Sequence, residues 1–416
     1  SGVYRLSGSC ADGSVTIKKG TTDVTLILDN LTLTSTDTAP ITCGKSSQVT
    51  IEAAAGTVNA LSDSEQNNGD TYPANENAEN AVLKCKDGSQ VTLCGTGSLT
   101  LTANGKNGIK SGASTDEDGE ASLTIRELTL TIHAPVNDAI NAGQLLTIES
   151  GELTIPAADD AIHCDYTLQI GAEGTDGPAI SITDCYEGLE AATLNVASGD
   201  IRIRASDNCL NAANSDLTGF DFSMNLSGGT INAYTTDGDG FDSNGTMTIS
   251  GGTICVWTAN TADNQPLDAD GTITITGGTV LAAGGSAGMG MKLSVSQPYV
   301  TFGQSGSMQP RGGGADALIS NGSTLAIWDE TDTLFSMEAP CSARFVFYSS
   351  PELTEDGSYT LLSDGENAGT AEAQTGESQS GFGGMPGGTS MPEPPDGSTP
   401  PEKPDGAPEP PDSGSV

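Results

Sequence analysis

Residues 239–257 read DGFDSNGTMTISGGTICVW, and they contain one complete copy of a unit that recurs along the chain. A short motif, DGFDS (239–243), is followed by the alternating pattern TMTI (246–249), a Gly-Gly turn and a second pattern, TICVW (253–257). Alternation with a period of two predicts strands, and no helical periodicity is present. The unit therefore predicts short strands separated by tight turns.

The motif, in which an apolar residue is followed by any residue and then a small one, occurs nine times. Its copies are APITC (39–43), AVLKC (81–85), NGIKS (107–111), DAINA (138–142), DAIHC (160–164), EGLEA (187–191), NCLNA (208–212), DGFDS (239–243) and QPLDA (265–269). Successive copies are 21 to 42 residues apart. Repetition of this kind predicts a solenoid. Leucine-rich repeats and immunoglobulin-like arrays fit less well, because neither combines variable spacing with Gly-Gly corners.

We therefore predict an all-β fold, a right-handed single-stranded parallel β-helix, since crossovers of that hand dominate between parallel strands. Neighbouring coils would lie about 4.8 Å apart, so that equivalent motif positions stack into columns. The apolar motif residues should form one inward column: Ile41, Leu83, Ile109, Ile140, Ile162, Leu189, Leu210, Phe241 and Leu267.

The repeat defines the expected domain organisation. It occupies residues 1–292, which we predict as the β-helix. Strand patterns at LAIWD (325–329) and ARFVFYSS (343–350) predict a β cap of the same domain over 293–370, because a solenoid needs its open end covered. Residues 371–416 are rich in Pro, Gly and Glu, which predicts a disordered tail or wall linker.

Composition excludes several functions. The chain has 416 residues, with 15 Lys and Arg against 55 Asp and Glu, for a net charge of −40. Such a chain repels phosphate backbones and anionic membranes, so we expect no nucleic-acid partner. It has no run of about 18 apolar residues, so we expect no membrane insertion. Nine cysteines without a C-x-x-C pair, and only two histidines, disfavour zinc and favour free, mostly buried thiols, with one or two disulfides as the alternative.

Carboxylates recur in two columns beside the apolar one, two residues before it and one residue after it. Stacked carboxylates repel each other where water is partly excluded, and oxygen-only ligand sets suit calcium. We therefore favour bound Ca2+ over a solvated acidic face, with ligands assembled across coils because Phe241 interrupts an EF-hand pattern. The predicted ligands are Asp138, Asp159, Asp160, Glu187, Glu190, Asp207, Asp237, Asp239, Asp242 and Asp268.

Two aromatic residues, Tyr234 and Trp257, fall in one column of adjacent coils when SGGTINAY (227–234) is aligned with SGGTICVW (250–257). If both rings face outward, they form a flat strip suited to sugar rings. The alternative, that they protect a corner of the solenoid, stays open.

Several stretches of the chain are typical of one known family: CGTGSLTL (94–101) before NGIKS (107–111), the D-G/A-I/L-x-A and SGGTI units, and FVFYSSPEL (345–353). Together they resemble a family of clostridial carbohydrate-binding proteins with a pectate-lyase-like parallel β-helix. The resemblance covers about residues 1–365. It implies an extracellular or cell-surface protein that uses calcium and binds plant cell-wall polysaccharide, cellulose and polygalacturonate, without established lyase activity. This chain departs from the pattern where glycine is expected before the apolar residue: Ala139, Ala161, Cys209 and Pro266.

The related calcium-dependent lyases use an aspartate cluster and a basic residue, which defines an alternative function. Asp138, Asp159 and Asp160 match three cluster positions, while His163 stands where the last aspartate would be. Lys110 would be the catalytic base. It lies two coils from His163, roughly 10 Å away, which is beyond the hydrogen-bond reach that a base needs.

The leading hypothesis is a secreted, monomeric, calcium-binding and non-catalytic polysaccharide-binding protein. The first alternative is a calcium-dependent polysaccharide lyase. The second is a structural surface adhesin whose partner is a protein.

Overall fold

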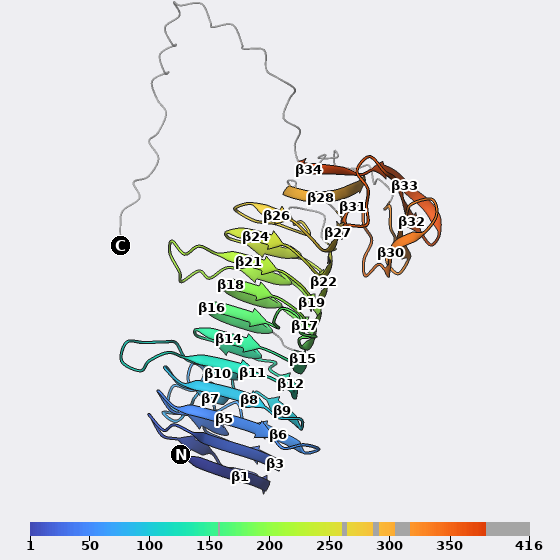
Figure 1. The fold of residues 1–416 in the computed structure, drawn as a ribbon. Helices are drawn as coiled ribbons and strands as arrows, with labels where there is room; N and C mark the ends of the chain where they lie inside the picture. Colours follow the sequence, from blue (N-terminus) through green and yellow to red (C-terminus); the bar gives the residue numbers. More distant parts are fainter. Residues whose placement is uncertain (157–158, 260–263, 286–290, 304–316, 380–416) are drawn as a thin grey trace, which may run out of the picture. The chain divides into compact units, whose positions relative to one another are not determined.

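The computed structural model describes every residue except 157–158, 260–263, 286–290, 304–316 and 380–416. The described residues form strands and no helix, so none of them provides a helix able to cross a membrane. Most strands stack in parallel, each paired with its equivalent in the next repeat of the chain (Figure 1). Three parallel ladders result, one for each side of a coil.

The first ladder contains the nine-fold motif. Its strands are β2 (Val15–Ile17), β4 (Ile41–Cys43), β7 (Ala81–Cys85), β10 (Asn107–Ser111), β13 (Ile140–Ala142), the beginnings of β16 (Ile162–Ile170) and β18 (Leu189–Val196), β20 (Leu210–Ala212) and β23 (Phe241–Ser243). They pair in register, and an isolated parallel bridge joins Phe241 to Leu267 after the last strand.

The second ladder follows the motif along each coil, and its strands run up the front of Figure 1. They are the beginning of β3 (Val24–Thr34), β5 (Gln48–Ala53), β8 (Gln90–Cys94), β11 (Ser122–Ile125), β14 (Leu145–Ile148), the ends of β16 and β18, β21 (Ser223–Leu226), β24 (Thr246–Ile249), β26 (Ile273–Ile275) and β28 (Lys292–Gly303). Because Ile273 pairs in parallel with Leu293, the coils extend just beyond the predicted boundary at residue 292.

The third ladder contains the strands that follow the glycine turns. They are the end of β3, β6 (Val58–Ser62), β9 (Ser98–Thr102), β12 (Leu128–His133), β15 (Gly151–Pro156), β17 (Ala179–Cys185), β19 (Asp200–Ala205), β22 (Thr230–Thr235), β25 (Thr253–Thr258) and β27 (Thr279–Gly284). At the N-terminal end, β1 (Gly2–Cys10) pairs in parallel along β3.

The core lies between the three ladders. The predicted inward column is confirmed, because all nine of its residues are 0–1% exposed. Alternate residues of the other ladders complete the core, as with Leu146 and Leu168, which are paired and fully buried. Burial of this kind contributes about 25 cal/mol per Å² of apolar surface, and it makes one register far more stable than a one-residue slip. The predicted hand of winding stays a prediction.

The Gly-Gly corners are needed for close stacking. Gly229 and Gly252 have φ of +82° and +83°, and a Cβ on Gly252 would lie 2.6 Å from the Gly229 carbonyl oxygen. Only glycine combines that backbone conformation with that approach.

The cysteines match the prediction of free, mostly buried thiols. All nine are free, and all except Cys10 are buried. Cys43 and Cys85 are paired positions of the small-residue column, and their contact together with burial raises the pKa of the Cys43 thiol.

The C-terminal segment, residues 317–379, is antiparallel. Its strands are β29 (Thr324–Trp328), β30 (Thr333–Glu338), β31 (Phe345–Ser349), β32 (Ser358–Ser363), β33 (Glu366–Glu372) and β34 (Gln374–Gln379). The strand β31 pairs with both β27 and β28, and β34 pairs with β28. The predicted disordered tail was therefore placed too early, since residues 371–379 form strands. The rest of that tail lies outside the described residues.

The C-terminal segment also covers the outer side of the last coils. Outward side chains of β25 and β27, among them Trp257 and Leu281, join a second apolar cluster with Ile327 and Tyr348. This contact explains why the strands of the segment are apolar on the side that faces the coils.

Candidate functional site

The column that follows the apolar motif residue carries the candidate metal ligands. Asn141, His163, Glu190, Asn211 and Asp242 lie side by side on successive strands of the first ladder. Because the strands are parallel and in register, the side chains of this column stack one coil apart. The structure brings two groups of three ligands together here, Asp160–His163–Glu190 and Asp239–Asp242–Asp268.

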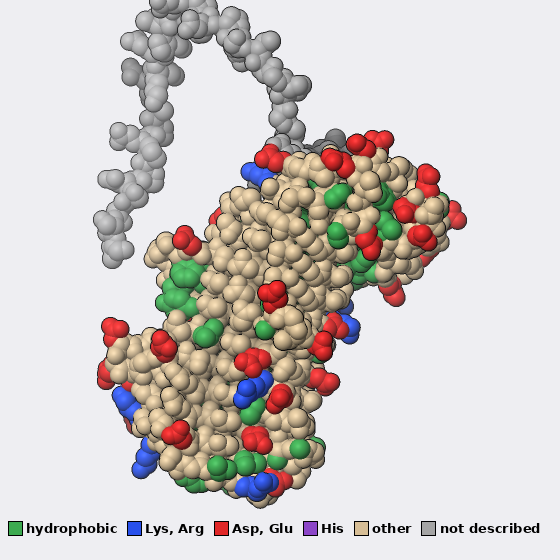
Figure 2. Space-filling model, viewed as in Figure 1, with side chains coloured by type: hydrophobic (Ala, Val, Ile, Leu, Met, Phe, Trp, Pro, Cys, Tyr) green, Lys and Arg blue, Asp and Glu red, His purple; other side chains and the backbone are tan. Residues whose placement is uncertain are grey.

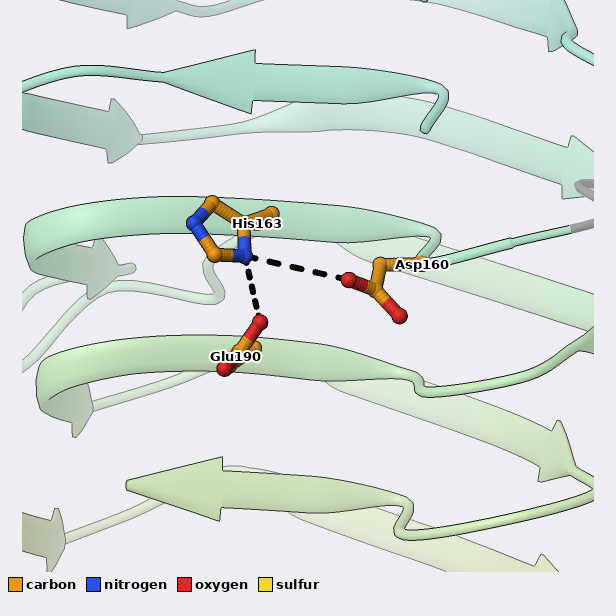
Figure 3. A group of neighbouring side chains, drawn as sticks. All are labelled: Asp160, His163 and Glu190. Atoms are coloured by element: carbon orange, nitrogen blue, oxygen red, sulfur yellow. Dashed lines mark hydrogen bonds and ion pairs between the residues drawn. The ribbon is translucent and has the colours of Figure 1, made fainter. Parts of the chain in front are cut away.

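The first group contains its own positive charge (Figure 3). His163 Nδ1 hydrogen-bonds Glu190 Oε2 and lies 3.7 Å from Asp160 Oδ2, and its Nε2 lies 3.0 Å from Asp165 Oδ1. Burial alone would lower the pKa of His163, but the three carboxylates outweigh it and raise the pKa to about 12. The carboxylates thus favour the charged form of the ring, which offsets part of the negative charge of the group. An imidazole also does not suit calcium, which takes oxygen ligands.

The second group is made of oxygen ligands alone. Single carboxylate oxygens of Asp239, Asp242 and Asp268 lie within 4.8 Å of one another, and all three side chains are half-buried. Burial raises the pKa of Asp239 to about 7, with the neighbouring carboxylates adding to it and the backbone N–H of Gln265, at 2.5 Å, opposing it. Burial, followed by the charge of Asp268, raises the pKa of Asp242 to about 6. Among the described residues, no basic side chain lies within 4.0 Å of these carboxylates.

Two amide oxygens near the second group are buried and make no hydrogen bond among the described residues. They are Asn211 Oδ1 and Gln265 Oε1, and both residues are 7% exposed. Asn211 lies directly opposite Asp242 on the neighbouring strand, and Gln265 contacts Asp239 through its backbone. A buried acceptor without a donor is costly, and calcium takes amide oxygens as ligands alongside carboxylates. The donor set of this group therefore fits calcium.

Two further predicted ligands are held by amides. Asp138 is 5% exposed and accepts a hydrogen bond from Asn141 Nδ2 at 2.7 Å, and burial raises its pKa to about 6. Glu187 accepts from Asn211 Nδ2 at 3.0 and 3.2 Å, and burial raises its pKa to about 8. Both carboxyl groups thus lie within the acidic columns but outside the two groups of three.

The remaining predicted ligands are more peripheral. Asp159 is half-buried, and burial followed by the charge of Asp160 raises its pKa. Asp207 is half-buried beside Gly238, where an added Cβ would lie 2.3 Å from its Oδ1. Asp237 is exposed. None of these three joins a group of three ligands within the part of the chain that is described.

The prediction of an exposed aromatic strip for sugar binding is wrong. Tyr234 and Trp257 do lie opposite each other, as predicted. However, Trp257 is only 1% exposed because the C-terminal segment covers it. Tyr234 is half-buried, with the Arg204 guanidinium carbon 5.4 Å from its ring centroid. The alternative interpretation, protection of a corner, agrees with these contacts.

Comparison with known proteins places the chain in a family. A family model described as "Carbohydrate-binding domain-containing protein" matches residues 1–288. The chain belongs to this family. A carbohydrate-binding domain-containing protein of Acetivibrio thermocellus is 35% identical over 109 residues, which is 26% of this chain and 37% of the relative. The chain thus spans little more than a third of that relative's length.

A solved structure titled as the polysaccharide lyase-like protein from C. thermocellum, a gadolinium derivative, is also similar. It shares 24% sequence identity with this chain at a TM-score of 0.37, and the match covers 66% of this chain and 84% of that one.

For a carbohydrate-binding protein, the outer side of the second ladder provides a surface that the sequence interpretation missed. From β3 onward, one outward column contains only hydroxyl and amide side chains, and beyond Thr25 it ends at Val3 of β1. Its polar members are Thr25, Thr50, Thr92, Thr124, Thr147, Gln169, Asn195, Asn225, Thr248, Thr274 and Ser294. Tan, which marks the backbone and the side chains that are neither hydrophobic nor charged, predominates on the face shown (Figure 2). The signal was present in the sequence as the polar residue that alternates with apolar ones in each second-ladder strand.

The N-terminal end of this column is hollowed. A hollow of about 480 Å³ is lined by Thr25, Gln48, Thr50, Gln90 and Thr92, with Asp23, Val24 and Val49 beside them. Apart from Asp23, the polar side chains offer hydrogen-bond donors and acceptors without charge, which is the chemistry that sugar hydroxyls require.

Proposed function

We propose that this chain is a calcium-binding, non-catalytic protein that acts outside the cell and binds plant cell-wall polysaccharide, cellulose or polygalacturonate or both. Its membership of the carbohydrate-binding family supports polysaccharide as the partner. The oxygen-only group of Asp239, Asp242 and Asp268, beside two unpartnered amide oxygens, supports calcium.

The calcium proposal is restricted to one of the two groups. In the first group His163 already supplies a positive charge beside Asp160 and Glu190, and its imidazole does not suit calcium. In the second group Asp239, Asp242 and Asp268 would hold the ion, and Asn211 Oδ1 and Gln265 Oε1 are the neutral oxygens available to complete the set. When bound, the ion would offset the repulsion between these carboxylates and offer a positive site to an acidic sugar.

The neutral column of the second ladder is the surface that we propose for an uncharged glycan. Cellulose carries hydroxyl groups and no charge, so it gains nothing from ion pairs and loses nothing near a chain of charge −40. Successive hydroxyl and amide side chains one coil apart provide many weak, equivalent contacts, and such contacts gain affinity through their number.

Two binding assays test this proposal. The protein should co-sediment with cellulose with or without calcium, and it should be retarded in affinity gels that contain polygalacturonate in a calcium-dependent manner. Asp242→Asn with Asp268→Asn should remove most of the calcium-dependent retardation. Asp216→Asn with Asp221→Asn, two exposed acidic residues on β20–β21 connections, removes the same charge as a control. Wild-type protein that binds neither polymer would contradict the proposal.

A further inference from the structure

Two lysines of the first ladder are neighbours without a counterion. Lys84 on β7 and Lys110 on β10 are paired positions, so their side chains stack one coil apart. Both are half-buried. Neither makes an ion pair within 4.0 Å of any carboxylate in the described residues.

The other basic side chains of the described chain do not share this situation. Seven have a carboxylate within 4.0 Å: Arg5, Lys19, Lys45, Lys86, Lys106, Arg126 and Arg202. Of those that remain, Lys18, Lys292 and Arg344 are exposed to water, and Arg204 lies over the ring of Tyr234. Among the described residues of a chain with 55 acidic side chains, Lys84 and Lys110 are thus the half-buried cations without a carboxylate within 4.0 Å.

This arrangement is unfavourable for the empty protein. Burial lowers the pKa of Lys84, and the positive charge of Lys110 lowers it further, against a smaller opposing effect of Glu79. The packing does not demand a cation at these positions, because the same column holds the neutral Thr42 one coil before and Asn141 one coil after. An anion between the two ammonium groups would remove the repulsion and supply the missing hydrogen-bond acceptors.

We propose that Lys84 and Lys110 form an anion subsite that binds the carboxylate of an acidic sugar unit. This assignment rests on the proposed function, which gives polysaccharide as the partner. It adds a contact to the sugar carboxylate that does not need a metal. The surroundings favour a single carboxylate over a polyanion. Asp70 is close enough to interact electrostatically with Lys110, and Glu79 with Lys84, so a ligand with several negative charges would be repelled there.

The decisive experiment compares two double variants that lose the same charge. Lys84→Met with Lys110→Met keeps the aliphatic length of both side chains, whereas Lys18→Met with Lys292→Met removes two exposed, unpaired cations. Binding of a short oligogalacturonate, measured by calorimetry in calcium, should weaken about tenfold or more in the first variant, since one charge-assisted hydrogen bond corresponds to about that factor. The control should bind like the wild type. Both variants should bind cellulose and calcium unchanged, and the first should unfold at the same temperature or higher.

A second measurement keeps the test independent of the whole polymer. Side-chain ammonium or Cε signals of Lys84 and Lys110 are followed by NMR during titration with sodium galacturonate, with glucose and sulfate as comparison ligands. Galacturonate should shift both signals, glucose should not, and sulfate should act more weakly. Equal oligogalacturonate affinity in wild type and the first variant, or lysine signals that ignore galacturonate, would overturn the subsite. Equal shifts with sulfate would overturn its assignment to a sugar acid. Failure of the polymer assays with intact lysine shifts would instead contradict the proposed function alone.

Discussion

His163 hydrogen-bonds Glu190 across two neighbouring coils, and this contact places a cation of the chain within one acidic group. Three coils farther along the same column from His163, Asp242 has acidic neighbours and, among the described residues, no cation within 4.0 Å. One column of a repetitive fold thus contains both an acidic group with its own cation and a group that fits an added ion.

The first prediction concerns His163→Asn. The substitution leaves Asp160, Asp165 and Glu190 without their cation, so we expect a loss of about 1–3 kcal/mol in the free energy of unfolding at pH 7. Because the folded pKa of His163 is raised to about 12, its contribution in the wild type is complete below about pH 6.5 and declines as the pH rises toward 12. Calcium should restore more stability to the variant than to the wild type, since the group then contains oxygen ligands only. Denaturant unfolding with and without calcium measures this, and a variant as stable as wild type would contradict it.

The second prediction concerns metal removal. A ligand bound only by the folded state stabilises it by about 2.7 kcal/mol at one hundred times its dissociation constant. EDTA should therefore lower the melting temperature, and calcium should restore it. Asp242→Asn with Asp268→Asn should abolish this response, whereas the control Asp216→Asn with Asp221→Asn should retain it. A melting curve that EDTA does not change, with no metal found by elemental analysis, would exclude the calcium proposal.

The third prediction concerns pH in the absence of metal. The folded pKa values of Asp239 and Asp242 are raised to about 7 and about 6, above the unfolded value of 3.8, so the folded state binds more protons between these limits. Stability of the metal-free protein should therefore fall as the pH rises from about 4 to about 7. Calcium should flatten this dependence, and Asp239→Asn should reduce it by about 1 kcal/mol or more. Stability that rises with pH over this interval without metal would contradict the assignment.

The fourth prediction concerns the core beneath the candidate metal site. Phe241 lies between Asp239 and Asp242 in the sequence, and its side chain is fully buried in the core. Phe241→Ala should therefore lower the free energy of unfolding by about 3–5 kcal/mol, because it leaves a cavity. Thr248→Ala, on the outward side of β24, should cost far less. Chemical denaturation of both variants measures the difference, and similar losses would argue against the inward assignment of the motif.

The fifth prediction separates binding from catalysis. We expect no unsaturated product from polygalacturonate in calcium, followed by ultraviolet absorbance. Lys110 stacks on Lys84 and lies opposite Asn141. We therefore assign Lys110 to anion binding and not to proton abstraction. Product formation that Lys110→Ala abolishes would replace the binding proposal with a lyase.

The parallel stacking and the inward column could be predicted from the sequence, because both follow from local rules. Alternation decides which side of a strand a residue such as Phe241 occupies, and recurring motifs decide which residues become neighbours in adjacent coils. The same reasoning predicts Tyr234 opposite Trp257, which the strand pairing confirms.

The sequence by itself therefore determined the columns and their order, since these depend on spacing along the chain. Only the tertiary structure decided what lies beside each column. It buried Trp257 under the C-terminal segment, gave His163 three carboxylates, and left Lys84 and Lys110 without a described carboxylate within 4.0 Å. The physical reason is that exposure and charge compensation depend on contacts between distant segments. A periodic pattern records which way a side chain points, and it contains no information about what comes to cover or neutralise it.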